Sequence, residues 1–157
     1  MVSQQDDFAV RSFAGREKYG RPEFRVTWQN GVTMLDHISI AVSDLSRAIG
    51  FYDAVLQTLG YVRVWTVDDA AGYARPGETD EPFALKEQRE SVATNERFHV
   101  AFKAPSREAA SAFHAVAMAL EATDNGGVGL HIEYGSNYYA AFVIDLDGNR
   151  IEAVHHG

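Results

Sequence analysis

Apolar and polar residues alternate over residues 35–42 (LDHISIAV), which predicts a β-strand. One face of this strand carries its branched apolar residues, Ile38, Ile40 and Val42. The other face carries His37, because successive side chains of a strand point to opposite faces. The spacing changes after Asp44. Apolar residues then recur every three or four positions up to Leu59, which predicts an amphipathic helix that ends at Gly60.

The same order of elements occurs twice along the chain. Three strand-like stretches follow the first helix, at residues 61–67, 72–75 and 82–86. A strand, a helix and three further strands then follow, at residues 97–103, 105–120, 129–134, 138–145 and 150–155. His37 precedes Phe51 by as many positions as His99 precedes Phe113, and both intervals cross the junction between a strand and a helix. The chain is therefore interpreted as a duplicated unit of about 60 residues.

This repeat predicts an α+β fold of two βαβββ modules that form an eight-stranded, incompletely closed cup, a mixed sheet with one helix outside each module. The modules span about residues 34–90 and 96–156 of a domain that covers residues 34–157. Residues 1–33 lack the regular pattern and are rich in polar residues. They form an N-terminal arm, which is either an extension that packs on the domain or on a second subunit, or sequence upstream of a natural start at Met34.

Composition narrows the possible classes of function. The chain has 157 residues, a formal net charge of −8 and no cysteine. An acidic surface repels phosphate backbones and anionic lipids, and the absence of cysteine excludes disulfides, thiolate metal ligands and a cysteine nucleophile. No apolar stretch approaches the roughly 20 residues that span a bilayer, and the first residues do not resemble a signal peptide. We therefore expect a cytoplasmic protein that binds neither nucleic acid nor membranes.

Two histidines and one glutamate fall on a common face of the predicted strands. His37 and His99 lie opposite the apolar face that each helix must cover, so both are expected to point into the cup. On the last strand, Ile151 and Ala153 suit the helix side, which directs Glu152 to the side of the histidines. A carboxylate between apolar neighbours is costly to bury unless a cation compensates it. Two imidazoles and one carboxylate suit one divalent ion, Fe(II), Mn(II), Zn(II) or Ni(II), and leave coordination positions open for a substrate.

Three further side chains are candidates for contact with a substrate. His131 shares one face of a predicted strand with Glu133, and the alternative role of these two residues is a solvated polar pair. Tyr138 and Tyr139 open the next strand. A tyrosine hydroxyl at this point could donate to a bound oxyanion, and the alternative is an aromatic contact in the core.

Three stretches resemble one known family. Residues 35–61 (LDHISIAVSDLSRAIGFYDAVLQTLGY) resemble the opening of a module of the vicinal oxygen chelate superfamily, which comprises glyoxalases, bleomycin resistance proteins and extradiol dioxygenases. Residues 145–154 (DLDGNRIEAV) resemble its closing hairpin, and residues 98–102 (FHVAF) the strand that opens the second module. The resemblance covers about residues 34–156. It implies paired βαβββ modules around a metal that chelates vicinal oxygens of a substrate, with ligands on the first, fifth and eighth strands: His37, His99 and Glu152.

Two positions depart from the family pattern. Leu146 replaces the usual proline of the closing hairpin. The fourth strand, which supplies a Glu or Gln ligand in the glyoxalases and epimerases of the family, carries Ala84 at that position. The resemblance therefore implies a three-ligand site like that of the dioxygenase or fosfomycin-type thiol transferase branches. Glyoxalase I chemistry needs a second carboxylate to move a proton, so the pattern favours this chemistry less.

The sequence thus predicts a metal-dependent enzyme that acts on a small oxygenated substrate, with dioxygenase-like or with lyase-like or thiol-transferase-like chemistry. The alternative is a non-catalytic protein that sequesters an antibiotic or a metabolite in the same cup. Members of the superfamily are commonly dimers, so we expect a homodimer. The linker near residues 88–96 closes the cup within one chain or exchanges modules between two chains.

Overall fold

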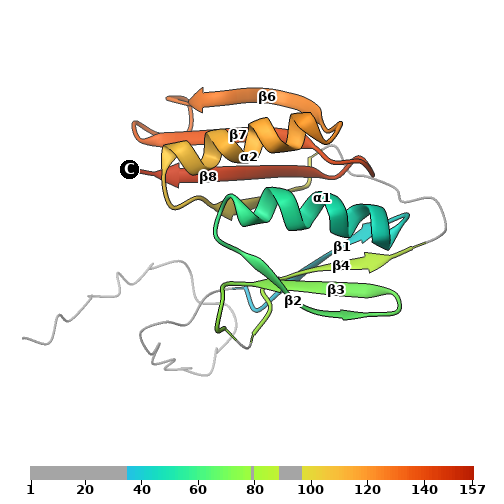
Figure 1. Cartoon of the computed structure of the whole chain (residues 1–157). Coiled ribbons are helices and arrows are strands. Elements are labelled where there is room, and N and C mark those ends of the chain that lie inside the picture. Colours follow the sequence, from blue (N-terminus) through green and yellow to red (C-terminus); the bar gives the residue numbers. More distant parts are fainter. Residues whose placement is uncertain (1–34, 79, 89–96) are drawn as a thin grey trace, which may run out of the picture. The chain divides into compact units, whose positions relative to one another are not determined.

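The computed structural model describes residues 35–78, 80–88 and 97–157 (Figure 1). The expected N-terminal arm and nearly all of the expected linker lie outside these residues. The first module consists of β1 (Ile38–Val42), α1 (Leu45–Gln57), β2 (Val62–Val67), β3 (Ala70–Ala74) and β4 (Phe83–Glu87). The second module consists of β5 (His99–Lys103), α2 (Arg107–Ala119), β6 (Thr123–Leu130), β7 (Tyr138–Ile144) and β8 (Arg150–His156).

Each module builds its own four-stranded sheet. The strand orders are β1-β4-β3-β2 and β5-β8-β7-β6, so the second module repeats the topology of the first. In each sheet the first and last strands of the module pair in parallel, and the other neighbours are antiparallel. This match confirms the predicted α+β fold of two βαβββ modules. Among the described residues no ladder joins the two sheets, so the eight strands form two open sheets rather than a continuous one.

Both helices are 13 residues long and begin at a capping side chain. The Asp44 carboxylate accepts from the backbone amide of Arg47 over 2.9 Å, and the Ser106 hydroxyl accepts from that of Ala109 over 3.2 Å. Such caps satisfy backbone donors that the start of a helix leaves without partners. After α1, Gly60 adopts a φ of +84°, which reverses the chain toward β2. None of the helices in the described parts of the chain is long and apolar enough to cross a membrane.

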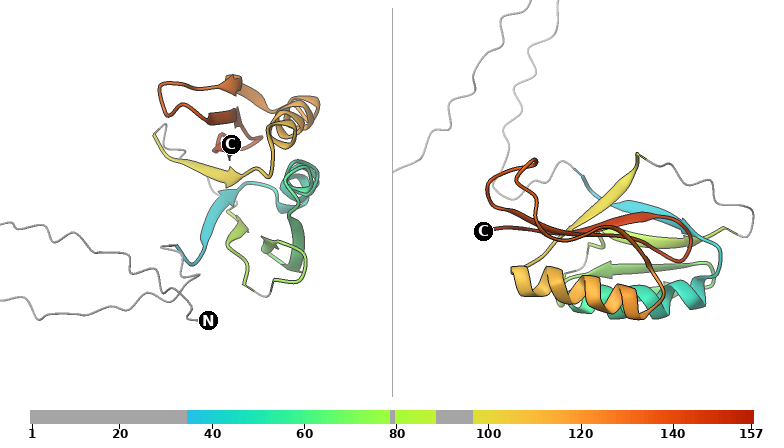
Figure 2. Two further views of the ribbon diagram at one scale, coloured as in Figure 1. Left: turned by 90° about the vertical axis from the view of Figure 1, so that its left-hand side faces the viewer. Right: turned by 90° about the horizontal axis from the view of Figure 1, so that it is seen from above.

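The apolar core lies between the helices and the sheets. Figure 2 shows α1 and α2 side by side on one side of the strands, and the two helices are in contact. Val42 of β1 and Ile151 of β8 are buried, as the alternation in their strands predicts. The rings of Phe83 in β4 and Phe102 in β5 meet edge to face with centroids 4.9 Å apart, which joins the cores of the two modules.

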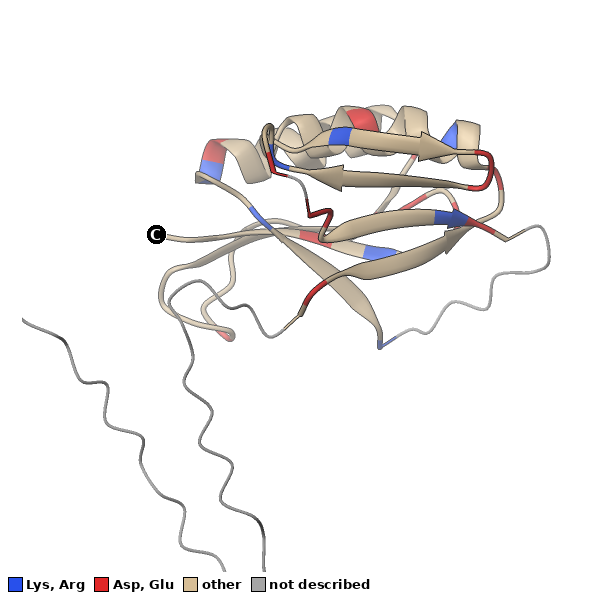
Figure 3. Ribbon diagram, turned by 90° about the horizontal axis from the view of Figure 1, so that it is seen from below, with Lys and Arg blue, Asp and Glu red and all other residues tan. Residues whose placement is uncertain are grey.

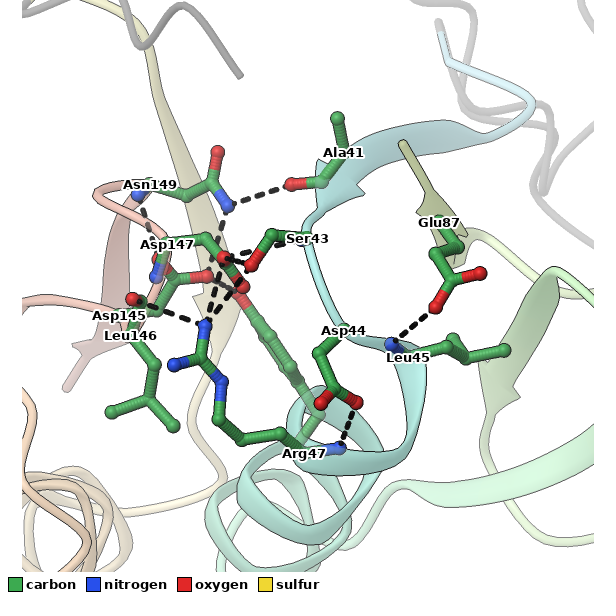
Figure 4. Close-up of polar contacts among 11 residues, drawn as sticks. Ala41, Ser43, Asp44, Leu45, Arg47, Glu87, Asp145, Leu146, Asp147 and Asn149 are labelled. Carbon is green, nitrogen blue, oxygen red and sulfur yellow. Dashed lines mark hydrogen bonds and ion pairs between the residues drawn. The ribbon is translucent and has the colours of Figure 1, made fainter. Parts of the chain in front are cut away.

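The hairpin between β7 and β8 ties the second module to the first (Figure 4). Asp145 is buried and accepts from the backbone amides of Asp147 and Asn149 and from the Asn149 side chain, over 2.7–2.9 Å. Across the modules, the Tyr52 hydroxyl of α1 donates to Asp145 over 2.8 Å, and the Asn149 side chain donates to the Ala41 carbonyl over 3.1 Å. These bonds fix the start of β8 relative to the first module.

The strand β6 begins earlier than the sequence predicts. It spans Thr123–Leu130 rather than residues 129–134, because the pair Gly126-Gly127, which is typical of a turn, forms a bulge within the ladder to β7. Both glycines have positive φ angles, of 133° and 74°. His131 and Glu133 consequently lie in the turn after β6, and their predicted placement on one face of a strand is wrong.

Candidate functional site

Glu152 is a buried carboxylate in the middle of β8. Its neighbours Ile151 and Ala153 are buried on the side of the sheet that α2 covers, so Glu152 points to the other side. The residue is only 1% exposed. Its Oε1 atom accepts a hydrogen bond from the Tyr138 hydroxyl over 2.5 Å, whereas Oε2 is buried without a hydrogen-bond partner among the described residues. Burying such an oxygen is costly, so Oε2 marks a place where an external partner would stabilise the site.

His99 lies beside this oxygen. The strands β5 and β8 run parallel, with His99 opposite Arg150 and Ala101 opposite Glu152. This register brings His99 Nε2 to 3.3 Å from Glu152 Oε2. The His99 side chain is 52% exposed, so the pair of donor atoms is open to solvent on one flank. The structure therefore brings two of the three predicted metal ligands together.

The arrangement of His99 and Glu152 fits a divalent ion. Two donor atoms that bind one ion at about 2.1 Å lie roughly 3.0–3.4 Å apart for angles near 90–110° at the ion. The observed separation of 3.3 Å between Nε2 and Oε2 lies in this range. An imidazole nitrogen and a carboxylate oxygen are also a donor pair that Mn(II), Fe(II) and Zn(II) accept. The unpartnered Oε2 atom is thus chemically suited to a cation.

His37 stands apart from this pair. It directly precedes β1 in the first module, and its side chain is 59% exposed. Its Nδ1 atom donates to the Asp36 carboxylate over 2.7 Å, which leaves Nε2 for a ligand. In the part of a single chain that the structure describes, no three His, Asp or Glu side chains gather closely enough to hold a metal ion. The structure thus does not bring His37 to His99 and Glu152.

The two candidate tyrosines lie on opposite faces of β7. Tyr138 donates to Glu152, and burial together with this carboxylate raises the pKa of the Tyr138 hydroxyl. The hydroxyl of Tyr139 instead contacts the Ser111 hydroxyl of α2 at 3.0 Å, and its ring packs under the Arg107 guanidinium. Tyr138 therefore belongs to the site around Glu152, whereas Tyr139 lies on the helix side and contacts none of the site residues.

A polar hollow of about 550 Å³ adjoins the His99 side chain. Its walls come from β5, β6, β7, β8 and the turn after β6: His99, Asn125, Gly126, His131, Glu133, Tyr134, Phe142, Arg150 and Ile151. His131 Nδ1 donates to Glu133 over 3.1 Å, and His131 Nε2 is buried without a partner among the described residues. A backbone amide and the bond from His131 lower the pKa of the Glu133 carboxyl. The hollow is thus the space in which a small molecule would meet His99.

Sequence reasoning missed several residues around this hollow. Arg150 occupies the same face of β8 as Glu152, so the alternation that identified the glutamate could also have identified the arginine. Phe142 lies opposite Glu152 in the ladder, and its ring meets the His131 ring edge to face at 4.9 Å. Asn125 carried no usable signal, because its position depends on the glycine bulge in β6.

The opposite sheet offers no comparable donor at the position that the family pattern assigns to a ligand. Ala84 of β4 lies opposite Ser39 of β1 and Gly72 of β3 and contributes only a methyl group. Lysine and arginine positions are scattered over the described elements, without a run along one of them (Figure 3). The strand β4 therefore adds no ligand to the candidate site.

The chain is similar to several solved structures. A glyoxalase/bleomycin resistance protein from Albidiferax ferrireducens is 28% identical, with a TM-score of 0.70, over 80% of this chain and 100% of that one. A putative glyoxalase from Bacillus halodurans is 24% identical, with a TM-score of 0.57, over 80% and 96%. The fosfomycin resistance protein FosX from Listeria monocytogenes is 15% identical, with a TM-score of 0.58, over 78% and 93%. The last two likenesses concern the fold alone.

The family model agrees with this fold. No curated protein matches the chain. The model of the Glyoxalase/Bleomycin resistance protein/Dioxygenase superfamily matches residues 34–153, which includes both modules and the strands that carry His99 and Glu152. This chain belongs to the glyoxalase/bleomycin resistance protein/dioxygenase superfamily.

Proposed function

We propose that this protein is a divalent-metal-dependent enzyme that acts on a small oxygenated substrate through bidentate chelation, with dioxygenase-like, lyase-like or thiol-transferase-like chemistry. The observation that carries this proposal is the pair of Glu152 Oε2 and His99 Nε2. One is a buried carboxylate oxygen without a hydrogen-bond partner among the described residues, and the other is an imidazole nitrogen 3.3 Å away. A merely structural carboxylate at this depth would be expected to have donors at both oxygens.

The third ligand in this proposal is His37 of a second copy of the chain. Within one copy, His37 lies in the other module and does not join His99 and Glu152. Its Nε2 atom is available, because Asp36 accepts from Nδ1 and most of the side chain is exposed. A homodimer that faces the first module of one chain with the second module of the other would complete two identical sites.

The surrounding side chains have separate roles in this proposal. A bound divalent ion would act as a Lewis acid toward two oxygens of the substrate. The Tyr138 hydroxyl, whose pKa is raised, keeps its proton and holds Oε1, so that Oε2 of Glu152 stays directed toward His99. Glu133 orients the His131 ring through Nδ1, which leaves Nε2 as the group that could exchange a proton with a substrate in the hollow.

One similar structure supports the choice of a metal. A mutant of FosX from Listeria monocytogenes was solved in complex with Mn(II) and 1S,2S-dihydroxypropylphosphonic acid, and it shares 15% identity with this chain at a TM-score of 0.59. That protein has the same fold and binds a divalent ion together with an oxygenated small molecule. It supports Mn(II) as the first ion to test.

Complementation between two defective chains tests the proposal. His37→Ala and Glu152→Gln each remove one ligand, and each variant alone is expected to lose tight Mn(II) binding, measured by electron paramagnetic resonance. If a site takes His37 from one chain and Glu152 from the other, mixing and re-equilibrating the two variants restores one intact site in each mixed dimer. Asp36→Asn is a milder control, which keeps every ligand and is expected to weaken binding only modestly.

Two results would contradict the proposal. Wild-type protein that binds no Mn(II), Fe(II), Zn(II) or Ni(II) above the level of the Glu152→Gln variant would exclude the metal site. In that case, retained binding of small molecules would favour a sequestering protein. Failure of the mixed variants to recover binding, while the wild type binds metal tightly, would exclude a site shared between two chains.

A further inference from the structure

Arg150 is a cation without a counter-charge in the hollow of the second module. It is half-buried and lies directly opposite His99 in the ladder, and its guanidinium makes no hydrogen bond or ion pair with the described residues. Four other arginines are each held by an acid or an aromatic ring: Arg47 by Asp147, Arg63 by Asp53, Arg75 by Tyr61 and Arg107 by Tyr139. A free guanidinium is unexpected in a chain with a net charge of −8, where carboxylates are abundant.

Neither of the two carboxylates near Arg150 is paired with it. Glu152 shares its face of β8 but is held by Tyr138 at Oε1 and lies beside His99 at Oε2. Glu133, on the wall of the hollow, accepts from His131. Neither acid forms an ion pair with Arg150. The guanidinium therefore presents its donors to the hollow rather than to another side chain of the described chain.

We propose that Arg150 binds the anionic group of the substrate, an oxyanion such as a carboxylate, phosphonate or phosphate. The planar guanidinium donates two parallel hydrogen bonds to such a group. Asn125 and His131, which also line the hollow, offer an amide and an unpartnered imidazole nitrogen to its remaining oxygens. The inference rests on the proposed function in one respect, because it takes the hollow beside His99 as the place of the substrate.

The register limits the size of the substrate. Residues in register on neighbouring strands lie about 4.8 Å apart, and residues two positions apart on one strand lie about 6.6 Å apart. Arg150 is in register with His99 and two positions before Glu152, so its Cα lies within about 7 Å of theirs, and an anion that it holds in the hollow lies near the two proposed metal ligands. The substrate is therefore a small acid whose chelating oxygens lie close to its anionic group.

Binding of methylphosphonate to metal-free protein tests this inference directly. Its affinity is measured by titration calorimetry and by the shift of the Arg150 side-chain NMR resonance, at constant ionic strength, with neutral dimethyl methylphosphonate as the comparison ligand. Arg150→Gln is expected to weaken methylphosphonate binding at least tenfold, and Arg150→Lys, which keeps the charge but not the planar fork, by less. Arg107→Gln is the matched control, because it removes the same charge on the helix side of the same sheet.

The inference is overturned if Arg150→Gln and Arg107→Gln weaken methylphosphonate binding equally, if wild-type protein does not bind it, or if the neutral ester binds as tightly as the anion. Metal titrations on the same samples separate this result from the proposed function. Arg150-dependent anion binding in a protein that holds no metal would refute the metal site and leave the anion site standing. Metal binding without Arg150-dependent anion binding would do the reverse.

Discussion

Two buried carboxylates of the second module, Asp145 and Glu152, should respond differently to neutralisation. Asp145 accepts four hydrogen bonds: from the backbone amides of Asp147 and Asn149, from the Asn149 side chain and from the Tyr52 hydroxyl. Glu152 is more deeply buried but accepts a single hydrogen bond, from Tyr138. A buried carboxylate whose oxygens are all hydrogen-bonded stabilises the fold. A buried carboxylate with an unpartnered oxygen destabilises the fold unless a bound cation compensates its charge.

The hydrogen bonds set the magnitude of this contrast. In Asp145→Asn the new NH₂ group faces at least one donor, and the remaining hydrogen bonds lose their charged acceptor. A hydrogen bond to a charged group contributes about 1.5–3 kcal/mol, so the free energy of unfolding should fall by about 2–4 kcal/mol. In Glu152→Gln the amide oxygen still accepts from Tyr138, and the NH₂ group replaces an oxygen that has no described donor. Losing the charge-assisted bond from Tyr138 destabilises the fold, and removing a buried, uncompensated charge stabilises it. The free energy of unfolding should therefore change by less than about 1 kcal/mol.

Urea unfolding of chelator-treated protein at neutral pH measures both changes, with an unchanged slope as the check on two-state behaviour. Added Mn(II) should stabilise the wild type and not Glu152→Gln, because only a ligand-competent native state gains from binding. A metal-free Glu152→Gln variant destabilised as strongly as Asp145→Asn would show that Glu152 is a structural residue, and would refute this reasoning.

Three further predictions concern the fold around the site. Tyr52→Phe removes the 2.8 Å bond to Asp145 and should lower the unfolding free energy by about 1.5–3 kcal/mol, whereas Tyr61→Phe, whose exposed bond is 3.5 Å long, should change it by less than about 0.5 kcal/mol in the same urea assay. Burial and the Glu152 carboxylate raise the pKa of the Tyr138 hydroxyl, which contributes stability that is complete below pH about 10 and is lost above it. The free energies of unfolding of wild type and Tyr138→Phe should therefore converge as pH rises past about 10, and a difference that widens would contradict this prediction. Gly72→Ala places a Cβ against the Trp65 indole, closer than van der Waals contact allows, and should displace this partly exposed ring, seen as altered tryptophan emission; an unchanged spectrum would contradict the contact.

The alternation of polar and apolar residues predicted the fold and the common face of two candidate ligands, His99 and Glu152. The period of two fixes which face a strand residue occupies, so the common face of His99 and Glu152 followed from β5 and β8 alone. The same rule placed Arg150 on that face, although its charge gave no reason to single it out before the hollow was visible. The predicted start of β6 at residue 129 was wrong because Gly126 and Gly127 form a bulge inside the ladder, so that the strand begins at Thr123.

The meeting of His37 with the other two ligands is a different kind of prediction. Alternation gives the face of His37 within its own module, but the distance to His99 and Glu152 depends on how modules of one or two chains are arranged. No sequence period encodes that arrangement. Tyr138 and Tyr139 are adjacent and therefore lie on opposite faces of β7. The Tyr138 hydroxyl contacts Glu152, whereas the Tyr139 hydroxyl contacts Ser111 on the helix side.

Anomalous diffraction from crystals grown with Mn(II) tests the metal centre most directly. We predict one peak per chain at about 2.0–2.3 Å from both His99 Nε2 and Glu152 Oε2, with His37 of a second copy as a further ligand. No peak between these two atoms at saturating Mn(II), or a peak bound only by other side chains, would contradict the central claim.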